Sequence, residues 1–153
     1  MQRKDREITD FSEMESVIKS SDVCRIGLCD GDMPYVVPVN FGYRDMQVYV
    51  HCAKKGRKLD IIAANNNVCV EFEKGHELKR GGDIACDWGA KYMSVIGFGR
   101  AELVEDAEGK LEALKILMAQ YDSREFVFSE KDISKVAIIK ISLSEITGKK
   151  AHY

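Results

Sequence analysis

Only two prolines occur in the 153 residues, which excludes a proline-rich linker architecture. No apolar run approaches the ~18 residues that a membrane-spanning helix needs, and the charged residues 1–7 contain no apolar signal core. Neither sign of charge dominates, because 23 Lys and Arg face 25 Asp and Glu, for a formal net charge of −2. A chain-wide basic field for nucleic acid is therefore absent. We expect a cytoplasmic protein that binds neither membrane nor nucleic acid.

Cysteine and histidine are too dispersed to form a recognisable metal or redox motif. The five cysteines cannot all pair within one chain, and none shows C-x-x-C spacing. Cys24, Cys52 and Cys69 stand in apolar runs, where a small buried hydrophobe is the simplest role. The three histidines lie far apart, so we expect no metal site. No G-x-S-x-G, P-loop or complete G-x-G-x-x-G motif occurs.

The composition is that of one ordinary globular domain. Hydrophobic residues make up 45% of the chain and charged residues 31%, which is too apolar for intrinsic disorder. A chain of this length can bury a core without disulfide or metal crosslinks. We expect a single domain over residues 1–153.

Apolar periodicity predicts about six strands with helices inserted between them. A capping box, Asp10-x-x-Glu13, opens a helix that ends near Ser20. Two further helices are expected at 57–64 and 107–121, and a long loop at 73–90. The expected strands are 23–28, 35–41, 46–52, 68–72, 91–103 and 136–143. Because most strands are joined by turns rather than crossover helices, the pattern favours a mainly β protein, with an antiparallel sheet closed into a small barrel.

Two strands carry residues that weaken a regular ladder. Pro38 cannot donate a backbone hydrogen bond, so its strand must be bulged or have a free edge there. Gly97 and Gly99 within 91–103 indicate a bulge or a close approach of two backbones.

The most informative segment is the basic stretch at the start of the helix predicted at 57–64. Lys54, Lys55, Arg57 and Lys58 fall within five positions, at the end of the helix where the dipole repels cations. No acidic residue precedes Asp60 in this segment to compensate. A bound phosphate would resolve the conflict, since backbone N–H groups and cationic side chains would all face it. A solvated basic loop is an equally good explanation on these grounds alone.

Four blocks of sequence together resemble the pyridoxamine 5′-phosphate oxidase-like flavoproteins, and within them the subgroup named for 5-nitroimidazole resistance (Nim-type proteins). They are PYVVPVNFGY at 34–43, YVHCAKKGRK at 49–58, CDW at 86–88 and YMSVIGFGRAE at 92–102. Their order and spacing agree over nearly the whole chain. Residues 3–8 and 146–149 are similar to that subgroup too.

The resemblance implies a six-stranded antiparallel split β-barrel with peripheral helices, which forms a homodimer and binds FMN at the dimer interface. It assigns the FMN phosphate to Arg57 and Lys58, with Lys54 nearby. The isoalloxazine ring would lie along Val37, Pro38, Val39 and Asn40, and over His51, Cys52 and Ala53. Tyr92 and Ser94 would approach from the long strand, and Trp88 from the partner subunit.

The same resemblance implies an FMN-dependent oxidoreductase that reduces a small oxidised organic compound, with a nitro compound such as a 5-nitroimidazole as one candidate. The electron donor would be a nicotinamide or another cellular reductant. His51 would be the proton donor, because imidazole suits proton transfer near neutral pH. The arginines and the C-terminal Arg-x-His element with which true pyridoxamine phosphate oxidases bind their substrate have no match, so vitamin B6 oxidation is not expected. Two alternatives stay open: a non-catalytic flavin carrier or sensor, and the same barrel holding haem or a deazaflavin.

Overall fold

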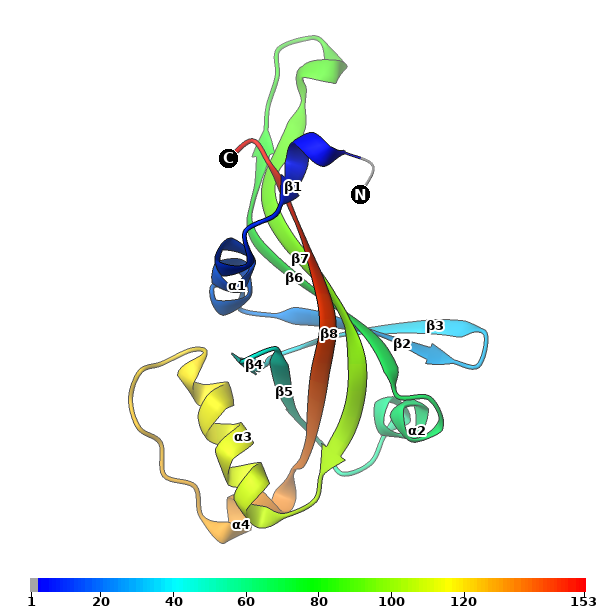
Figure 1. Cartoon of the computed structure of the whole chain (residues 1–153), viewed down its shortest axis with the longest axis vertical. Helices are drawn as coiled ribbons and strands as arrows, with labels where there is room; N and C mark the ends of the chain where they lie inside the picture. The colour runs from blue at the N-terminus through cyan, green and yellow to red at the C-terminus, as the bar shows by residue number, and fades with distance from the viewer. Residues whose placement is uncertain (1–2) are drawn as a thin grey trace.

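The computed structural model describes residues 3–153 and is built around one antiparallel sheet of eight strands (Figure 1). The strand order is β3-β2-β6-β7-β8-β5-β4, with β1 beside β8. The strands are β1 (Glu7–Ile8), β2 (Cys24–Asp30), β3 (Met33–Val39), β4 (Gly42–Arg44), β5 (Gln47–Cys52), β6 (Asn67–Lys79), β7 (Gly89–Val104) and β8 (Ala137–Ala151). The helices are α1 (Phe11–Lys19), α2 (Arg57–Ala64), α3 (Ala107–Ala119) and α4 (Glu130–Lys135), with short 3-10 turns at Lys4–Arg6 (η1) and Ala85–Asp87 (η2).

The two end strands of the sheet, β3 and β4, are joined by only Asn40 and Phe41, so the sheet must curve around its core to bring its two ends together. β3 nevertheless forms no ladder with β4 or β5. Alternate residues of the strands fill the interior, as expected for a pleated sheet with one buried face. On β5, Val48 and Val50 are fully buried and His51 is exposed, as the alternation of side chains along a strand requires. The predicted mainly β, antiparallel class with peripheral helices is confirmed. The prediction of six strands omitted β1 and β4, which are too short to produce a periodic pattern.

The three predicted helices, α1, α2 and α3, begin where the sequence indicates, whereas the short helix α4 was not predicted. Asp10 caps α1 by accepting a hydrogen bond from the Ser12 amide at 2.9 Å. The predicted partner in the capping box, Glu13, instead accepts a hydrogen bond from Lys150 of β8 at 2.6 Å. The apolar spacing of Leu111, Leu114, Met118 and Tyr121 indicates a buried stripe on α3, but of these four only Leu114 is buried. The buried residues are Ala113, Leu114, Ile116 and Leu117, because this helix packs across β4 and β5.

The loop expected at 73–90 is instead a long β-hairpin. β6 continues to Lys79, β7 begins at Gly89, and the two pair up to Lys79↔Gly89, with an irregularity between Lys74 and Glu77. We call this hairpin, residues 73–91, the arm; it projects from the upper end of the molecule in Figure 1. Most residues of the arm are exposed on both faces, so its sequence shows no apolar alternation. The last strand also exceeds the predicted 136–143, since β8 continues to Ala151 beside β7.

The two irregular strands are explained by their neighbours. β3, which contains Pro38, is the terminal strand of the sheet and pairs only with β2, which confirms the predicted free edge. The β7–β8 register shifts between Phe98 and Gly99, which confirms the bulge. A Cβ at Gly99 would collide with the Ser142 carbonyl oxygen, so this close approach requires glycine.

Candidate functional site

A split in the barrel lies between two strand edges that lack a sheet partner. One is the outer edge of β3, which is the end of the strand order. The other belongs to the end of β5, because β4 covers β5 only from Gln47 to Tyr49, and the residues after Tyr49 pair with β8 alone. Most of the predicted ring-contacting residues lie on these two edges. Residues 37–39 belong to β3 and residue 40 follows it directly, while residues 51–52 are the end of β5. The two segments are linked through the start of α2, because Arg57, five residues after Cys52, contacts Asp30 and Tyr35 of the β2–β3 hairpin.

The basic start of α2 follows directly from the second edge. Ala53 and Lys54 are exposed in the connection, and Gly56 precedes the helix with φ of 142°, a value that side chains disfavour. No side chain caps this helix, and a Cβ built at Gly56 would meet no atom within 4 Å. The first N–H groups of an α-helix have no partner within the helix, so this end is open to an anion.

Arg57 is held by an acid that the local sequence does not show. Its Nε and Nη2 donate hydrogen bonds of 3.1 and 3.0 Å to the same oxygen of Asp30, at the end of β2. Its guanidinium also lies over the ring of Tyr35 of β3, with 4.6 Å from Cζ to the ring centroid. The repulsion between the helix dipole and the cations at the start of α2 is thus partly compensated by Asp30, which is 27 residues away along the chain. No motif connects the two positions, and only the β2–β3 hairpin brings them together.

Lys58 lies on the inner side of the same helix start and influences two thiols. Burial raises the pKa of the Cys52 thiol, and the nearby Lys58 ammonium opposes that rise. Burial also raises the pKa of Cys24 to about 12, again with Lys58 acting in the opposite direction. These thiols are therefore protonated at neutral pH. Within residues 3–153 no ion pair involves Lys54, Lys55 or Lys58, so these three cations are available to a bound anion.

His51 stands on the outer face of β5 and is exposed. None of the hydrogen bonds or ion pairs formed by side chains in the described part of the chain involves His51. Its imidazole is accordingly free to meet a small molecule at the opening.

The remaining predicted site residues lie elsewhere in the protomer. Trp88 is at the tip of the arm, where its indole N–H donates to the Gly82 carbonyl at 3.0 Å. Tyr92 and Ser94 lie on β7 opposite Ala151 and Lys149 of β8. In Figure 1 the arm is at the upper end of the molecule and α2 is near the lower end. One protomer therefore does not bring Trp88, Tyr92 and Ser94 to the split.

The outer face of the sheet carries an exposed apolar row. The strand registers align Val36, Gly27, Cys69 and Phe98 across β3, β2, β6 and β7. Val36 is 60% exposed and Phe98 48%, and Ile96 beside them is 39% exposed. Because Gly27 has no side chain, the row contains a hollow of about 390 Å³, flanked by Arg25, Glu71 and Glu73. Exposed apolar patches of this kind are typical of protein–protein contacts.

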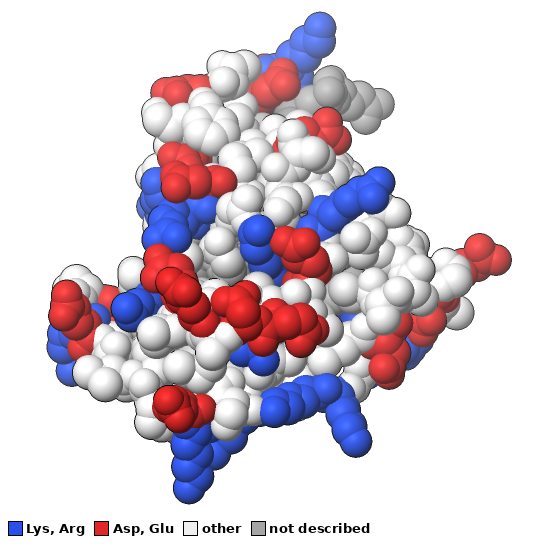
Figure 2. Space-filling model, turned by 60° about the horizontal axis from the view of Figure 1, so that its bottom comes forward, with Lys and Arg blue, Asp and Glu red and all other residues white. Residues whose placement is uncertain are grey.

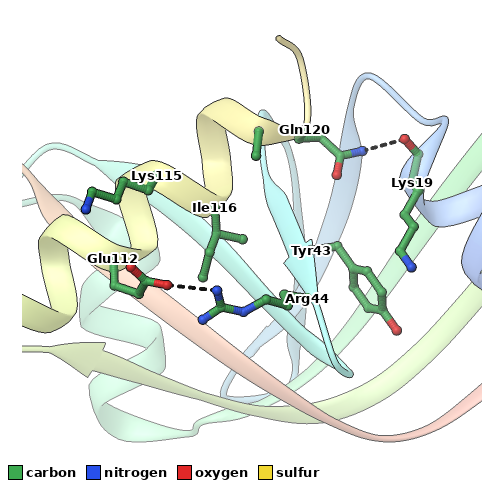
Figure 3. A pocket seen from close by; sticks show the side chains of 8 residues that line it. Lys19, Tyr43, Arg44, Glu112, Lys115, Ile116 and Gln120 are labelled. Atoms are coloured by element: carbon green, nitrogen blue, oxygen red, sulfur yellow. Dashed lines mark hydrogen bonds and ion pairs between the residues drawn. The ribbon is translucent and has the colours of Figure 1, made fainter. Parts of the chain in front are cut away.

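A further hollow is formed by other elements of the described residues. A hollow of about 480 Å³ lies between α1, β4 and α3 (Figure 3), and two of its cations, Arg44 and Lys19, are already paired with Glu112 and Glu15. Arg44 binds Glu112 at 2.8 Å, and the Gln120 amide donates to the Lys19 carbonyl at 3.1 Å. Figure 2 shows a band of acidic side chains with lysines and arginines on both sides of it, so neither sign covers that face alone.

Two further findings concern residues 3–153 only. None of their helices is long and apolar enough to cross a membrane. They contain no group of three or more His, Cys, Asp or Glu side chains placed to hold a metal ion.

Comparison with known proteins identifies the family. The sequence profile described as pyridoxamine 5′-phosphate oxidase matches residues 10–150. The chain belongs to the pyridoxamine 5′-phosphate oxidase family. The predicted relationship is thereby confirmed.

Among solved structures, one named for 5-nitroimidazole antibiotic resistance, from Bacteroides thetaiotaomicron VPI-5482, is 35% identical with a TM-score of 0.83, over 94% of this chain and 85% of that chain. An FAD-binding protein from Mesorhizobium loti is 25% identical with a TM-score of 0.70, over 95% and 97% of the two chains. A curated but uncharacterised protein of Rhizobium meliloti is 27% identical over 60 residues, and this match spans only 39% of either protein.

Proposed function

We propose that the chain is a flavin-dependent oxidoreductase that reduces a small oxidised organic compound, with FMN as its cofactor and a nitro compound as the candidate substrate class. The observation that carries the proposal is an uncapped, basic helix start that follows the free end of β5 and contacts the β2–β3 hairpin through Arg57, in a member of this family. The relative named for 5-nitroimidazole resistance supports the substrate class.

The residues at the split fit a flavin mononucleotide. Arg57, Lys58 and Lys54 supply positive charge for a phosphate dianion, and the open amides at the start of α2 supply neutral donors. The unpaired edges of β3 and β5 offer backbone donors and acceptors to the polar rim of a flat ring. The flavin, when bound, supplies the redox chemistry.

His51 is the group on this chain best placed to deliver a proton to the substrate at the opening. It stands at the end of β5, is exposed, and its imidazole has ring nitrogens that can donate or accept a proton. The half-buried Cys52 thiol stays protonated and therefore neutral, so it adds no negative charge beside a bound flavin.

The site is completed in our proposal by a second copy of the chain. The exposed row of Val36, Cys69 and Phe98 would form the contact between protomers, and the arm of one protomer would bring Trp88 toward the split of the other. Burial of this row would remove a large apolar area from water.

The decisive experiment is the absorption spectrum of the purified protein, followed by mass spectrometry of the released cofactor. Two near-ultraviolet and visible flavin bands with the mass of FMN are expected, whereas an intense Soret band would indicate haem and overturn the assignment. The mass also separates FMN from FAD, which the Mesorhizobium loti protein is named for binding. Reduction of a 5-nitroimidazole by NADH or NADPH should then be followed anaerobically. A flavin-loaded protein without turnover on any acceptor would be a carrier.

The second protomer is tested by light scattering after size-exclusion chromatography. The wild type should have about twice the chain mass of 17.3 kDa. Phe98→Asp should give a monomer with weakened FMN binding, since a charge in a buried contact is costly. Val127→Asp is the matched control, because Val127 is 98% exposed on a loop between α3 and α4. A monomeric wild type that retains FMN would contradict the shared site.

A further inference from the structure

We infer that Asp30 and Tyr35 are positioning residues for cofactor binding, which hold Arg57 in the orientation that receives the phosphate. This inference rests on the proposed function, because it assigns roles to two residues that act through the phosphate-binding arginine. Neither residue belongs to the basic segment, and both come from the β2–β3 hairpin.

The contacts fix the guanidinium in both position and plane. Asp30 Oδ2 accepts from Nε and Nη2 of Arg57, which occupies one edge of the guanidinium. The Tyr35 ring supports one face of the same group. An arginine has five N–H donors, so three remain, two on Nη1 and one on Nη2, for a phosphate at the start of α2.

The Tyr35 ring is itself held in place. Tyr35 is half-buried, and with Val37 and Val39 it belongs to the inward-facing row of β3 that packs against the core. The Tyr35 ring under Arg57 therefore belongs to the rigid sheet, and Asp30 is the last residue of β2 before the hairpin turn. A long side chain that is ordered before binding loses less conformational entropy when the ligand arrives.

Asp30 also has an opposing effect, because its carboxylate repels a phosphate. Asp30 is 44% exposed, so water and salt weaken that repulsion, whereas its two hydrogen bonds to Arg57 persist. We therefore expect positioning to exceed repulsion. Asp32, two residues further in the same turn and also exposed, is the matched control, since within residues 3–153 it forms no ion pair with Arg57.

The test is equilibrium binding of FMN and of riboflavin, which lacks the phosphate, to the full-length apoprotein. Asp30→Asn should weaken FMN binding by roughly 3- to 10-fold, the cost of ordering one free arginine side chain. Asp32→Asn should leave FMN affinity unchanged or slightly higher. Tyr35→Leu should weaken FMN binding by a similar factor, and Tyr35→Phe, which retains the ring, should recover it. Riboflavin affinity should stay within about twofold of the wild type in every variant, which also shows that each variant is folded.

A double-mutant cycle establishes that Asp30 acts through Arg57. In an Arg57→Ala background, Asp30→Asn should have no further weakening effect on FMN affinity. If the wild-type protein binds FMN but the Asp30→Asn variant has the same FMN affinity as the Asp32→Asn variant, the positioning role is wrong and the proposed function stands. If Asp30→Asn tightens FMN binding, the carboxylate competes with the phosphate and the inference is also wrong. If the wild type binds neither flavin, the proposed function fails, and this inference fails with it.

Discussion

The hydroxyl of Tyr121, just beyond the end of α3, accepts a hydrogen bond from the backbone N–H of Phe41 at 2.9 Å. Phe41 is fully buried at the junction of β3 and β4, where the chain passes from one end strand of the sheet to the other. The same hydroxyl donates to the Asp22 carbonyl at 2.9 Å. One phenol thus ties the helix to the corner at which the split in the barrel begins.

Tyr121→Phe is therefore expected to lower the free energy of unfolding by about 1–2 kcal/mol, because it leaves the Phe41 amide without a partner in a partly buried position. Urea denaturation measures the change. Tyr153→Phe is the matched control. The Tyr153 hydroxyl makes only a long, weak hydrogen bond of 3.5 Å to the Gly75 carbonyl, and the residue is 56% exposed. Equal stability of the two variants would show that solvent replaces the Tyr121 bonds at no cost.

Replacement of both Arg57 and Lys58 by alanine tests the phosphate site. Each charge-assisted contact is worth about 1.5–3 kcal/mol, so FMN binding should weaken by about two to four decades. Riboflavin should bind the wild type and the double variant almost equally. Lys55→Ala, from the same basic turn, is the control and should have a small effect.

The stability of that double variant separates a binding role from a structural one. Loss of two cations from the start of α2 relieves repulsion by the helix dipole, while loss of Arg57 removes an exposed ion pair with Asp30 and a stack on Tyr35. These opposing effects are small, so the apo double variant should unfold within about 1 kcal/mol of the wild type. Unchanged FMN affinity together with a clear loss of stability would make the basic turn a structural element.

Much of the fold could be predicted because local patterns determine it. Strict alternation placed Val48 and Val50 in the core, and the missing N–H of Pro38 placed β3 at an edge. The arm could not be predicted, since a hairpin that is exposed on both faces has no apolar period and is held mainly by backbone pairing. The extra length of β8 was missed for a related reason, because Ser144 and Glu145 interrupt its apolar pattern while its pairing with β7 continues.

The candidate site was predictable only in part. The basic segment, the edge proline and His51 lie in short stretches that the sequence shows directly. The resemblance to a known family is what assigned them to one site. The contact of Asp30 with Arg57 was not predictable, because it joins positions 27 residues apart through a hairpin whose twist no local pattern specifies. The same holds for Tyr121 and Phe41, 80 residues apart.

Stability should fall at alkaline pH because of a buried thiol. Burial raises the pKa of Cys24 to about 12, against about 9 when the thiol is exposed. Below pH 9 the thiol is protonated in both states and contributes no pH dependence. Between pH 9 and 12 the unfolded chain has lost a proton that the native state keeps, so the free energy of unfolding decreases as pH rises. The slope from this group approaches about 1.4 kcal/mol per pH unit.

Urea denaturation under reducing conditions between pH 8 and 10 checks this prediction. Cys24→Ala should be less stable overall but should show a shallower decline with pH than the wild type. Cys29→Ala, which removes an exposed thiol from the same strand, should retain the wild-type slope. Parallel declines in Cys24→Ala and wild type would assign the alkaline loss to other groups, such as the Tyr43 phenol, whose pKa burial also raises.

His51→Ala tests the proposed proton donor. The His51 side chain is exposed and takes part in no ion pair within residues 3–153, so its removal should leave both stability and FMN affinity close to those of the wild type. Turnover of the nitro substrate should fall by about 10²–10⁴-fold, the usual contribution of general acid catalysis. His76→Ala, which removes an exposed histidine from the arm, is the control and should retain full turnover. A His51→Ala variant with wild-type turnover across the pH range would make His51 a solvated residue at the end of β5, and the proton would then come from water or from the substrate itself.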